Sequence, residues 1–252
     1  MQSRKLGTTG IDVSVLGLGT VKLGRSENVR YPEPFEIPDD TAAREILAVA
    51  KSLGINLLDT APAYGTSEER LGKLLVGQRH DWVICTKVGE IFSDGASTYD
   101  FTPEHVQHSV KRSLQRIHTD YLDVVLIHSD GKDLSILESC GTLEALNDLK
   151  SRGWIRAVGI SHKSVTGAER AIDLGCDVIM ATLNLAAQEE SGVIADAGAA
   201  GCGVLVKKAF GSGHGSIDSL SFAVGHAGVS AVVVGTINPE HLRDNAAALA
   251  AE

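Results

Sequence analysis

Apolar residues recur along this chain with two different spacings, which alternate from residue 40 onward. Spacings of three and four residues predict amphipathic helices, and glycine follows several of these segments, as it commonly does where a helix ends. In the first of them, Ile46 and Ala50 share one face and Gly54 comes directly after the last apolar residue. The same reasoning predicts helices at 40–53, 67–77, 102–117, 143–153, 168–175, 188–200 and 239–250.

The second pattern consists of short segments of consecutive apolar residues, rich in β-branched side chains. Such segments are typical of parallel strands that are buried on both faces. Eight strands joined by helical crossovers predict an α/β fold, a (β/α)8 TIM barrel, as a single domain over residues 1–252. An open doubly wound sheet is the alternative, but no GxGxxG follows the first strand. The predicted strands are 15–19, 55–59, 82–87, 121–127, 155–160, 177–182, 203–207 and 230–235.

Local signals complete this outline. Residues 4–14 predict an N-terminal β-hairpin that could plug the lower end of the barrel. Ser67 could cap the second helix, and Thr102 followed by Pro103 marks the start of the third. Residues 24–38 form a proline-containing loop on the face where barrel active sites are built. Residues 209–229 are rich in Gly, Ser and Ala and leave room for one short helix.

Composition and net charge limit the classes of molecule that this chain is expected to bind. The net charge of −9 without a basic cluster argues against nucleic acid. The longest apolar segments have the length of strands, so no membrane span is expected, and residues 1–10 lack the apolar core of a secretion signal. The 4 cysteines form no CxxC motif or Cys/His cluster, which predicts reduced thiols, no metal site and a cytoplasmic location. The oligomeric state is left open.

Ionisable residues follow three successive predicted strands. Asp59 follows INLL, Lys87 follows WVICT and His128 follows YLDVVLI, while Tyr64 lies in the loop after Asp59. A parallel barrel brings the carboxyl ends of its strands to one rim, where these four side chains would meet. A charged Lys87 would lower the pKa of Tyr64 and make it a proton donor near neutral pH, with Asp59 holding the ammonium in place. His128 could hydrogen-bond a substrate oxygen.

These segments resemble the aldo-keto reductase superfamily from about residue 4 to residue 245. RKLGTTGIDVSVLGLGT is similar to the opening hairpin and first strand, LLDTAPAYG to the segment with the catalytic Asp and Tyr, and CTKVG and LIHSD to the lysine and histidine strands. The resemblance implies reduction of an aldehyde or ketone by a nicotinamide dinucleotide. It makes Tyr64 the general acid, tuned by Asp59 and Lys87, with His128 orienting the carbonyl.

The resemblance also implies a cofactor site across the barrel mouth. Ser161 would meet the nicotinamide amide, and the segment from Lys208 to Gly213 would offer N–H groups and a cation to the pyrophosphate. VVVGTINPEHLRDN is similar to the adenosine-binding segment. The implied cofactor residues are Gly19, Thr20, Lys22, Ser161, His162, Met180, Lys207, Lys208, Ala209, Gly211, Gly213, Thr236, His241 and Asn245.

Several of these positions depart from the family pattern. His162 stands where Asn is usual, Met180 where a carboxamide-binding Gln is expected, and Lys207 where an aromatic residue stacks on the nicotinamide. At the adenosine end, Gly235 replaces a frequent Lys and His241 replaces an Arg that pairs with the 2′-phosphate, which should weaken selectivity for that phosphate. NADPH is the expected cofactor by resemblance, and NADH is the alternative.

Two other functions fit parts of the pattern. A lyase or aldolase could use Lys87 as a Schiff-base amine, although a charged lysine paired with Asp59 is a poor nucleophile. A non-catalytic or weakly active cofactor sensor or scaffold could keep the four residues while Met180 and Lys207 relax the nicotinamide site. The physiological carbonyl substrate is not readable from the sequence.

Overall fold

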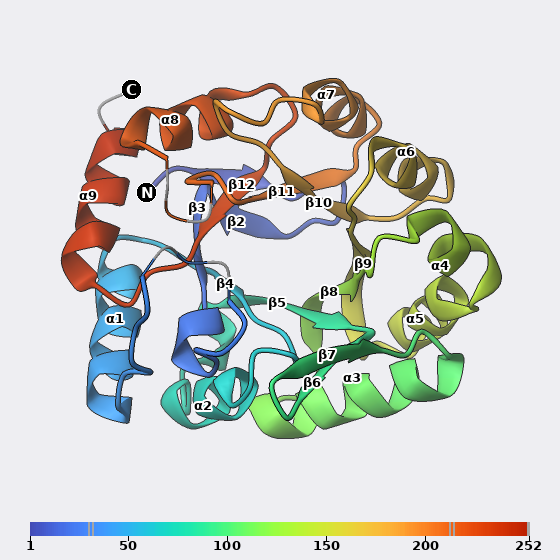
Figure 1. Cartoon of the computed structure of the whole chain (residues 1–252), viewed down its shortest axis with the longest axis horizontal. Helices are drawn as coiled ribbons and strands as arrows, with labels where there is room; N and C mark the ends of the chain where they lie inside the picture. Colours follow the sequence, from blue (N-terminus) through green and yellow to red (C-terminus); the bar gives the residue numbers. More distant parts are fainter. Residues whose placement is uncertain (30, 32, 212, 214, 251–252) are drawn as a thin grey trace.

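The computed structural model describes residues 1–29, 31, 33–211, 213 and 215–250. Its centre is a closed parallel barrel of eight strands, and β12 pairs with β3 to complete the circle (Figure 1). This closure confirms the TIM barrel and makes the open-sheet alternative wrong. In barrel order the strands are β3 (Leu16–Gly19), β4 (Leu57–Asp59), β5 (Val83–Val88), β8 (Leu122–His128), β9 (Ile155–Ser161), β10 (Val178–Thr182), β11 (Gly203–Lys207) and β12 (Ala231–Val234).

Helices surround this barrel (Figure 1). The apolar faces predicted from the sequence pack against its outer surface. On α1, for example, Ile46 and Ala50 are buried as their spacing required. The helices are α1 (Asp40–Ser52), α2 (Ser67–Leu74), α3 (Pro103–Ile117), α4 (Asp133–Ser139), α5 (Thr142–Ser151), α6 (Val165–Asp173), α7 (Ser191–Ala199), α8 (Ile217–Gly225) and α9 (Pro239–Ala250), with short 3₁₀ turns η1 (Val21–Leu23) and η2 (Arg79–Asp81).

The two predicted helix caps have different outcomes. Thr102 caps α3, because its side chain accepts a hydrogen bond from the backbone N–H of His105. Ser67 does not cap α2: Thr66 holds the cap position, and the Ser67 hydroxyl instead donates to the backbone oxygen of Thr20. The cap prediction for Ser67 was wrong because a contact distant in sequence takes its hydroxyl.

The predicted hairpin at the chain start is present and closes one end of the barrel. It consists of β1 (Ser3–Lys5) and β2 (Asp12–Ser14), which pair antiparallel. Leu6, Ile11 and Val13 pack in one cluster with inward-facing strand residues such as Leu57 and Val124. The hairpin therefore seals the amino-terminal end of the barrel with apolar side chains, and leaves the carboxyl-terminal end for the chemistry.

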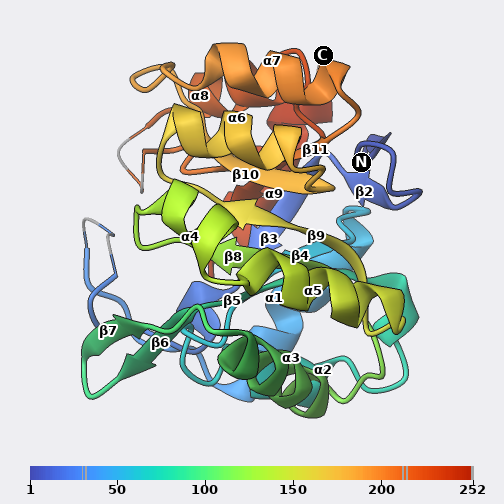
Figure 2. The same ribbon diagram turned by 90° about the vertical axis from the view of Figure 1, so that its right-hand side faces the viewer.

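A second hairpin, β6 (Glu90–Ser93) and β7 (Ala96–Tyr99), was not predicted, and neither was α4. The hairpin turns at Asp94 and Gly95, whose φ angles of 52° and 73° are positive. Asp-Gly is a strong signal for such a two-residue turn, so this element could have been found from the sequence. Figure 2 shows β6 and β7 at the end of the barrel away from β1 and β2.

No helix among the described residues is long and apolar enough to span a membrane.

Gly159 in β9 is required by close packing between neighbouring strands. A Cβ at this position would overlap the backbone carbonyl of Val178 on β10. We predict that Gly159→Ala lowers the free energy of unfolding by at least about 2 kcal/mol in urea denaturation, because overpacking in a rigid strand cannot relax. Gly192→Ala is the matched control: its added Cβ meets nothing within 4 Å, so its stability should be unchanged or slightly higher. Equal stability of the two variants would contradict this explanation.

Candidate active site

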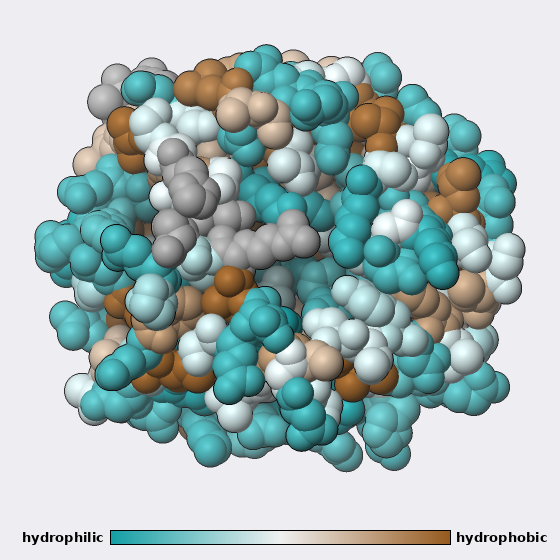
Figure 3. Space-filling model, in the orientation of Figure 1, coloured by the Kyte–Doolittle hydropathy of each residue, from teal (hydrophilic) through white to brown (hydrophobic). Residues whose placement is uncertain are grey.

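A cavity of about 1150 Å³ opens at the carboxyl-terminal mouth of the barrel. Figure 3 shows a hollow near the centre of this face, with many hydrophilic side chains around it. The cavity is lined by Asp59, Tyr64, Lys87 and His128, so the structure brings the four predicted catalytic side chains to one place. They reach it from adjacent strands: Asp59 ends β4, Lys87 lies near the end of β5 and His128 ends β8.

Lys87 is the most buried of these groups, with 1% of its surface exposed. Its Nζ donates to Oδ1 of Asp59 at 2.6 Å and to the backbone oxygen of Thr60 at 2.9 Å. Burial acts to lower the pKa of Lys87, but the attraction and hydrogen bond of Asp59, together with the attraction of Tyr64 and Cys85, outweigh it, and the pKa lies above its usual value. Lys87 is therefore a fixed ammonium, as the sequence predicted.

Tyr64 lies next to this ammonium, with Lys87 Nζ 4.8 Å from the centre of its ring. Burial raises the pKa of Tyr64, Lys87 lowers it and Asp59 raises it again, so that the pKa ends above its usual value. The predicted net lowering is not found, because the cost of desolvating a phenolate exceeds the attraction of one ammonium. The phenol therefore keeps its proton at neutral pH. Lys87 lies close enough to the ring to stabilise the phenolate that would form if the proton were transferred.

His128 faces Tyr64 edge-on, with 6.2 Å between the ring centres and an interplanar angle of 86°. Its Nδ1 lies 2.8 Å from Oε2 of Glu90 on β6. Burial lowers the pKa of His128, and the Glu90 carboxylate opposes this effect. The imidazole is thus mainly neutral at physiological pH and is held between the phenol and a carboxylate.

Glu90 and Arg25 are functional candidates that the sequence analysis missed. Burial acts to raise the pKa of Glu90, but His128, Ser97 and Arg25 lower it to about 2, so the carboxylate is ionised. The Arg25 guanidinium lies 3.5 Å from Glu90, donates to the backbone oxygen of Ala63 next to Tyr64, and stacks on Phe92 at 3.4 Å. One arginine therefore ties together the loop after β3, the Tyr64 loop and the β6–β7 hairpin.

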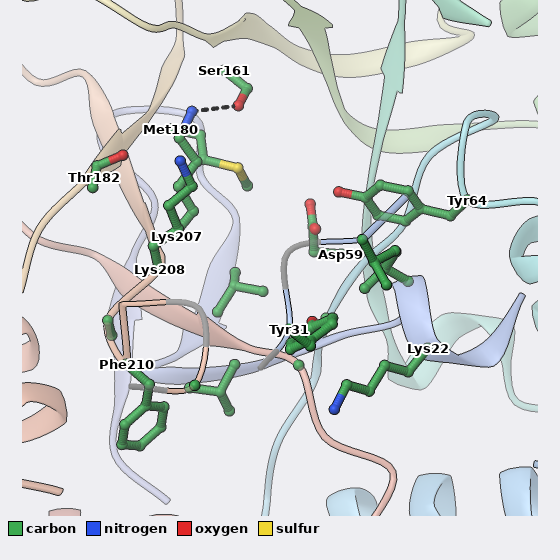
Figure 4. Close-up of a pocket in the computed structure, with 18 of the residues that line it drawn as sticks. Lys22, Tyr31, Asp59, Tyr64, Ser161, Met180, Thr182, Lys207, Lys208 and Phe210 are labelled. Atoms are coloured by element: carbon green, nitrogen blue, oxygen red, sulfur yellow. Dashed lines mark hydrogen bonds between the residues drawn. The ribbon is translucent and has the colours of Figure 1, made fainter. Parts of the chain in front are cut away.

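The far side of the cavity is lined by four residues that the resemblance implies for the cofactor, Ser161, His162, Met180 and Lys207. Lys207 Nζ donates to the Ser161 hydroxyl at 2.9 Å (Figure 4). It also donates to the backbone oxygen of His162 at 2.8 Å. The His162 ring is fully buried, and burial lowers its pKa to about 4. Neither ring nitrogen has a hydrogen-bond partner among the residues that the structure describes. Such orphaned nitrogens in a cavity wall are candidates for contact with a bound molecule.

Most of the remaining predicted cofactor residues also line the cavity, and two do not. Thr20 is fully buried, and its hydroxyl donates to the backbone oxygen of Asp59 at 2.9 Å, so it supports the site from behind. Gly211 lies outside the cavity wall, in a turn with φ of 51°. Those that line the cavity are Gly19, Lys22, Lys208, Ala209, Gly213, Thr236, His241 and Asn245.

Tyr31 is a further wall residue that the sequence analysis did not single out. It comes from the loop after β3, as the position of that loop at the mouth suggested, and Lys22 Nζ lies 4.0 Å from the centre of its ring. Burial, with a smaller effect of Asp59, raises the pKa of Tyr31 to about 12. A side chain at Gly235 would overlap the Tyr31 hydroxyl, so the glycine at 235 makes room for this tyrosine.

The family model described as "Aldo/keto reductase family" matches residues 15–216. The chain belongs to this family. A solved structure from Pseudomonas aeruginosa, described as a "putative aldo-keto reductase", is 50% identical, covers 99% of this chain and 94% of its own, and superposes with a TM-score of 0.92. The family assignment and the barrel thus agree.

Curated relatives are more distant. The uncharacterized oxidoreductase YqkF of Bacillus subtilis is 38% identical over 165 residues, which are 64% of this chain and 49% of the relative. The NADH-specific methylglyoxal reductase of Escherichia coli is 31% identical over 199 residues, 73% of this chain and 60% of the relative. The chain therefore spans about half the length of the first curated relatives it matches.

The buried ion pair gives a direct stability prediction. Asp59→Asn should lower the free energy of unfolding by about 3–5 kcal/mol, because it leaves the Lys87 ammonium buried without a counter-charge. The control is Asp81→Asn, which removes the partner of Lys51 at 2.7 Å in a pair whose side chains are about half exposed, and should cost less than about 1 kcal/mol. Urea denaturation measures both. Similar losses for the two variants would mean that burial adds nothing to the Lys87 pair.

The contact between Glu90 and His128 predicts a pKa change. A carboxylate beside an imidazole favours the protonated ring, so Glu90→Gln should lower the pKa of His128. An NMR titration of the His128 ring proton in both proteins measures this shift. An unchanged or raised pKa would show that the Glu90 charge does not act on the imidazole.

Proposed function

We propose that this chain is a nicotinamide-dependent oxidoreductase that reduces a small aldehyde or ketone, with Tyr64 as the proton donor. The observation that carries the proposal is the convergence on one cavity of a protonated phenol, an ammonium locked by a carboxylate at 2.6 Å, and an imidazole. Family membership supports the reaction class. Reduction of a carbonyl needs a proton at oxygen, and this arrangement supplies one from a group that binds its proton firmly until charge develops.

The shape and chemistry of the cavity suit a dinucleotide. Its wall includes the four catalytic candidates, the two lysines Lys207 and Lys208, and the glycines Gly213 and Gly215. Lys208 would meet a phosphate, and the glycines keep the wall open for close approach. The buried orphan nitrogens of His162 lie in the same wall. We propose NADPH as the preferred cofactor and NADH as the alternative, since one relative is named an NADH-specific reductase.

In the proposed mechanism, each of the four side chains has a different role. A nicotinamide dinucleotide held in this cavity would supply the hydride for the carbonyl carbon. The Tyr64 hydroxyl gives its proton to the carbonyl oxygen, and Lys87, 4.8 Å from the ring, stabilises the resulting phenolate. Asp59 keeps the ammonium charged. His128, whose ring faces the Tyr64 ring edge-on and is held by Glu90, would border the place of the carbonyl oxygen and limit the directions from which it can approach Tyr64. Solvent then restores the tyrosine proton.

Two alternatives remain less well supported. A Schiff base on Lys87 would require a neutral amine, but the pKa of Lys87 is raised and two acceptors already hold its Nζ. A non-catalytic dinucleotide sensor would bind cofactor without turnover on any aldehyde. A cytoplasmic location and a small-molecule substrate stay predictions of the sequence.

Tyr64→Phe tests the proposal. It should reduce carbonyl turnover about 10²–10⁴-fold on a panel of aldehydes, because a positioned general acid is lost. NADPH affinity, measured by fluorescence titration, should stay within about a few fold, since the ring remains. Tyr121→Phe is the matched control: its hydroxyl lies 3.4 Å from His80, outside the cavity, and full activity is expected. Unchanged turnover in Tyr64→Phe would make the proton-donor assignment wrong.

A further inference from the structure

Lys207 presents a positive charge to the cavity and, in the part of the chain that the structure describes, has no close negative partner. Its Nζ donates to two uncharged oxygens, on Ser161 (Figure 4) and on the backbone of His162. An ammonium has three N–H donors, so one is left over, and its charge is not neutralised by either acceptor. Among the described residues, no carboxylate lies within 4.0 Å of Lys207, in contrast to Lys87.

The groups around Lys207 are mostly cationic. Burial is the main cause that lowers the pKa of Lys207 to about 7. The positive charges of the nearby lysines also lower this pKa, whereas the negative charge of Glu190 raises it. Glu190 is engaged elsewhere: its Oε2 accepts from the backbone N–H of Thr182 at 2.9 Å and lies 3.6 Å from His162 Nε2. The ionisable groups that act on Lys207 or feel its charge are Glu190, Lys208, Lys87, Lys163, His162 and His128.

The position of Lys207 relates it to the reacting ring of the proposed cofactor, so this inference rests on the proposed function. Strand β11, which carries Lys207, lies opposite β5, which carries Lys87, in the closed barrel. Ser161, Met180 and Lys207 lie across the cavity from Tyr64 (Figure 4). A hydride donor must approach a carbonyl held at Tyr64, so the nicotinamide belongs between these two walls.

We infer that Lys207 makes the site discriminate between the two redox states of the cofactor, favouring the reduced ring over the oxidised ring. Dihydronicotinamide is uncharged, whereas the oxidised ring is a pyridinium cation that an unneutralised ammonium repels. Both states carry the same phosphates, so attraction of Lys207 or Lys208 to phosphate cancels in the ratio of their affinities. The oxidised product would therefore leave more readily than the reduced cofactor, and the site favours turnover toward carbonyl reduction.

The discrimination depends on pH. Below neutrality Lys207 carries its charge and repels the pyridinium, and above neutrality the amine is neutral and the repulsion disappears. By linkage, the oxidised ring must in turn promote loss of the Lys207 proton. Binding of NADP⁺ near pH 7 therefore releases protons, and binding of NADPH releases fewer.

The experiment is isothermal titration calorimetry of the protein with NADPH and with NADP⁺, at about pH 6 and about pH 9. For the natural chain, the ratio of the NADP⁺ dissociation constant to that of NADPH should fall on the order of tenfold between these conditions, the size expected for like charges several ångströms apart. Repetition in buffers with different ionisation enthalpies counts the protons released. Neither readout requires turnover.

Two substitutions separate the charge from the shape of the side chain. Lys207→Met should give a low ratio at both pH values, because no charge is present. Lys207→Arg keeps a permanent charge and should give a high ratio at both. Lys208→Met is the matched control: it should weaken both forms together and keep the ratio within about twofold, because Lys208 is proposed to meet a phosphate and both forms carry the same phosphates.

The outcomes are distinguishable. If the natural chain binds neither NADPH, NADH nor their oxidised forms, the proposed function fails. If it binds them but the ratio in Lys207→Met equals that of the natural chain at about pH 6, only the role of Lys207 is overturned. A pH-dependent ratio that persists in Lys207→Arg would assign the effect to another group, such as His162 or Glu190, and would also overturn the inference.

Discussion

The buried pair of Lys87 and Asp59 is the interaction on which the site depends. In the parallel register Asp59 lies opposite Cys85, two residues before Lys87, so that all three side chains point to the same face of the sheet. An ammonium with 1% exposure is tolerable inside the barrel only because the carboxylate compensates its charge. This pair marks the boundary between the apolar interior closed by the β1–β2 hairpin and the polar mouth. Tyr64 and His128 are arranged around it.

The site contains two lysines in contrasting surroundings. Lys87 has a carboxylate partner, and its pKa is raised. Among the described residues, Lys207 donates to uncharged oxygens alone, and its pKa falls to about 7. In the proposed reaction, Lys87 would supply a permanent charge where a phenolate forms, and Lys207 a charge that can be lost where the cofactor changes its own charge. Burial acts on both lysines in the same direction, but around Lys87 the combined attraction of Asp59, Tyr64 and Cys85 exceeds its effect.

Behind the four catalytic candidates, Arg25 and Glu90 join the loops that carry them. Arg25 contacts the segment next to Tyr64 through Ala63, and Glu90 contacts His128. The catalytic side chains thus come from rigid strand ends or are held by a charged network rather than by free loops. This rigidity matters because proton and hydride transfer require the reacting atoms to be aligned within a fraction of an ångström.

The sequence by itself determined the barrel, its hairpin plug and the meeting of Asp59, Tyr64, Lys87 and His128, because strand periodicity and order dictate which ends share a rim. It also contained the Asp94-Gly95 turn, which was overlooked. Only the tertiary structure decided that Glu90 reaches His128, that Tyr31 fills the space over Gly235, and that Lys207 has no carboxylate close to it among the described residues. These contacts depend on the paths of the loops, which local sequence patterns do not encode. The pKa values depend on desolvation by atoms that are distant in the chain, and local patterns do not encode this effect either.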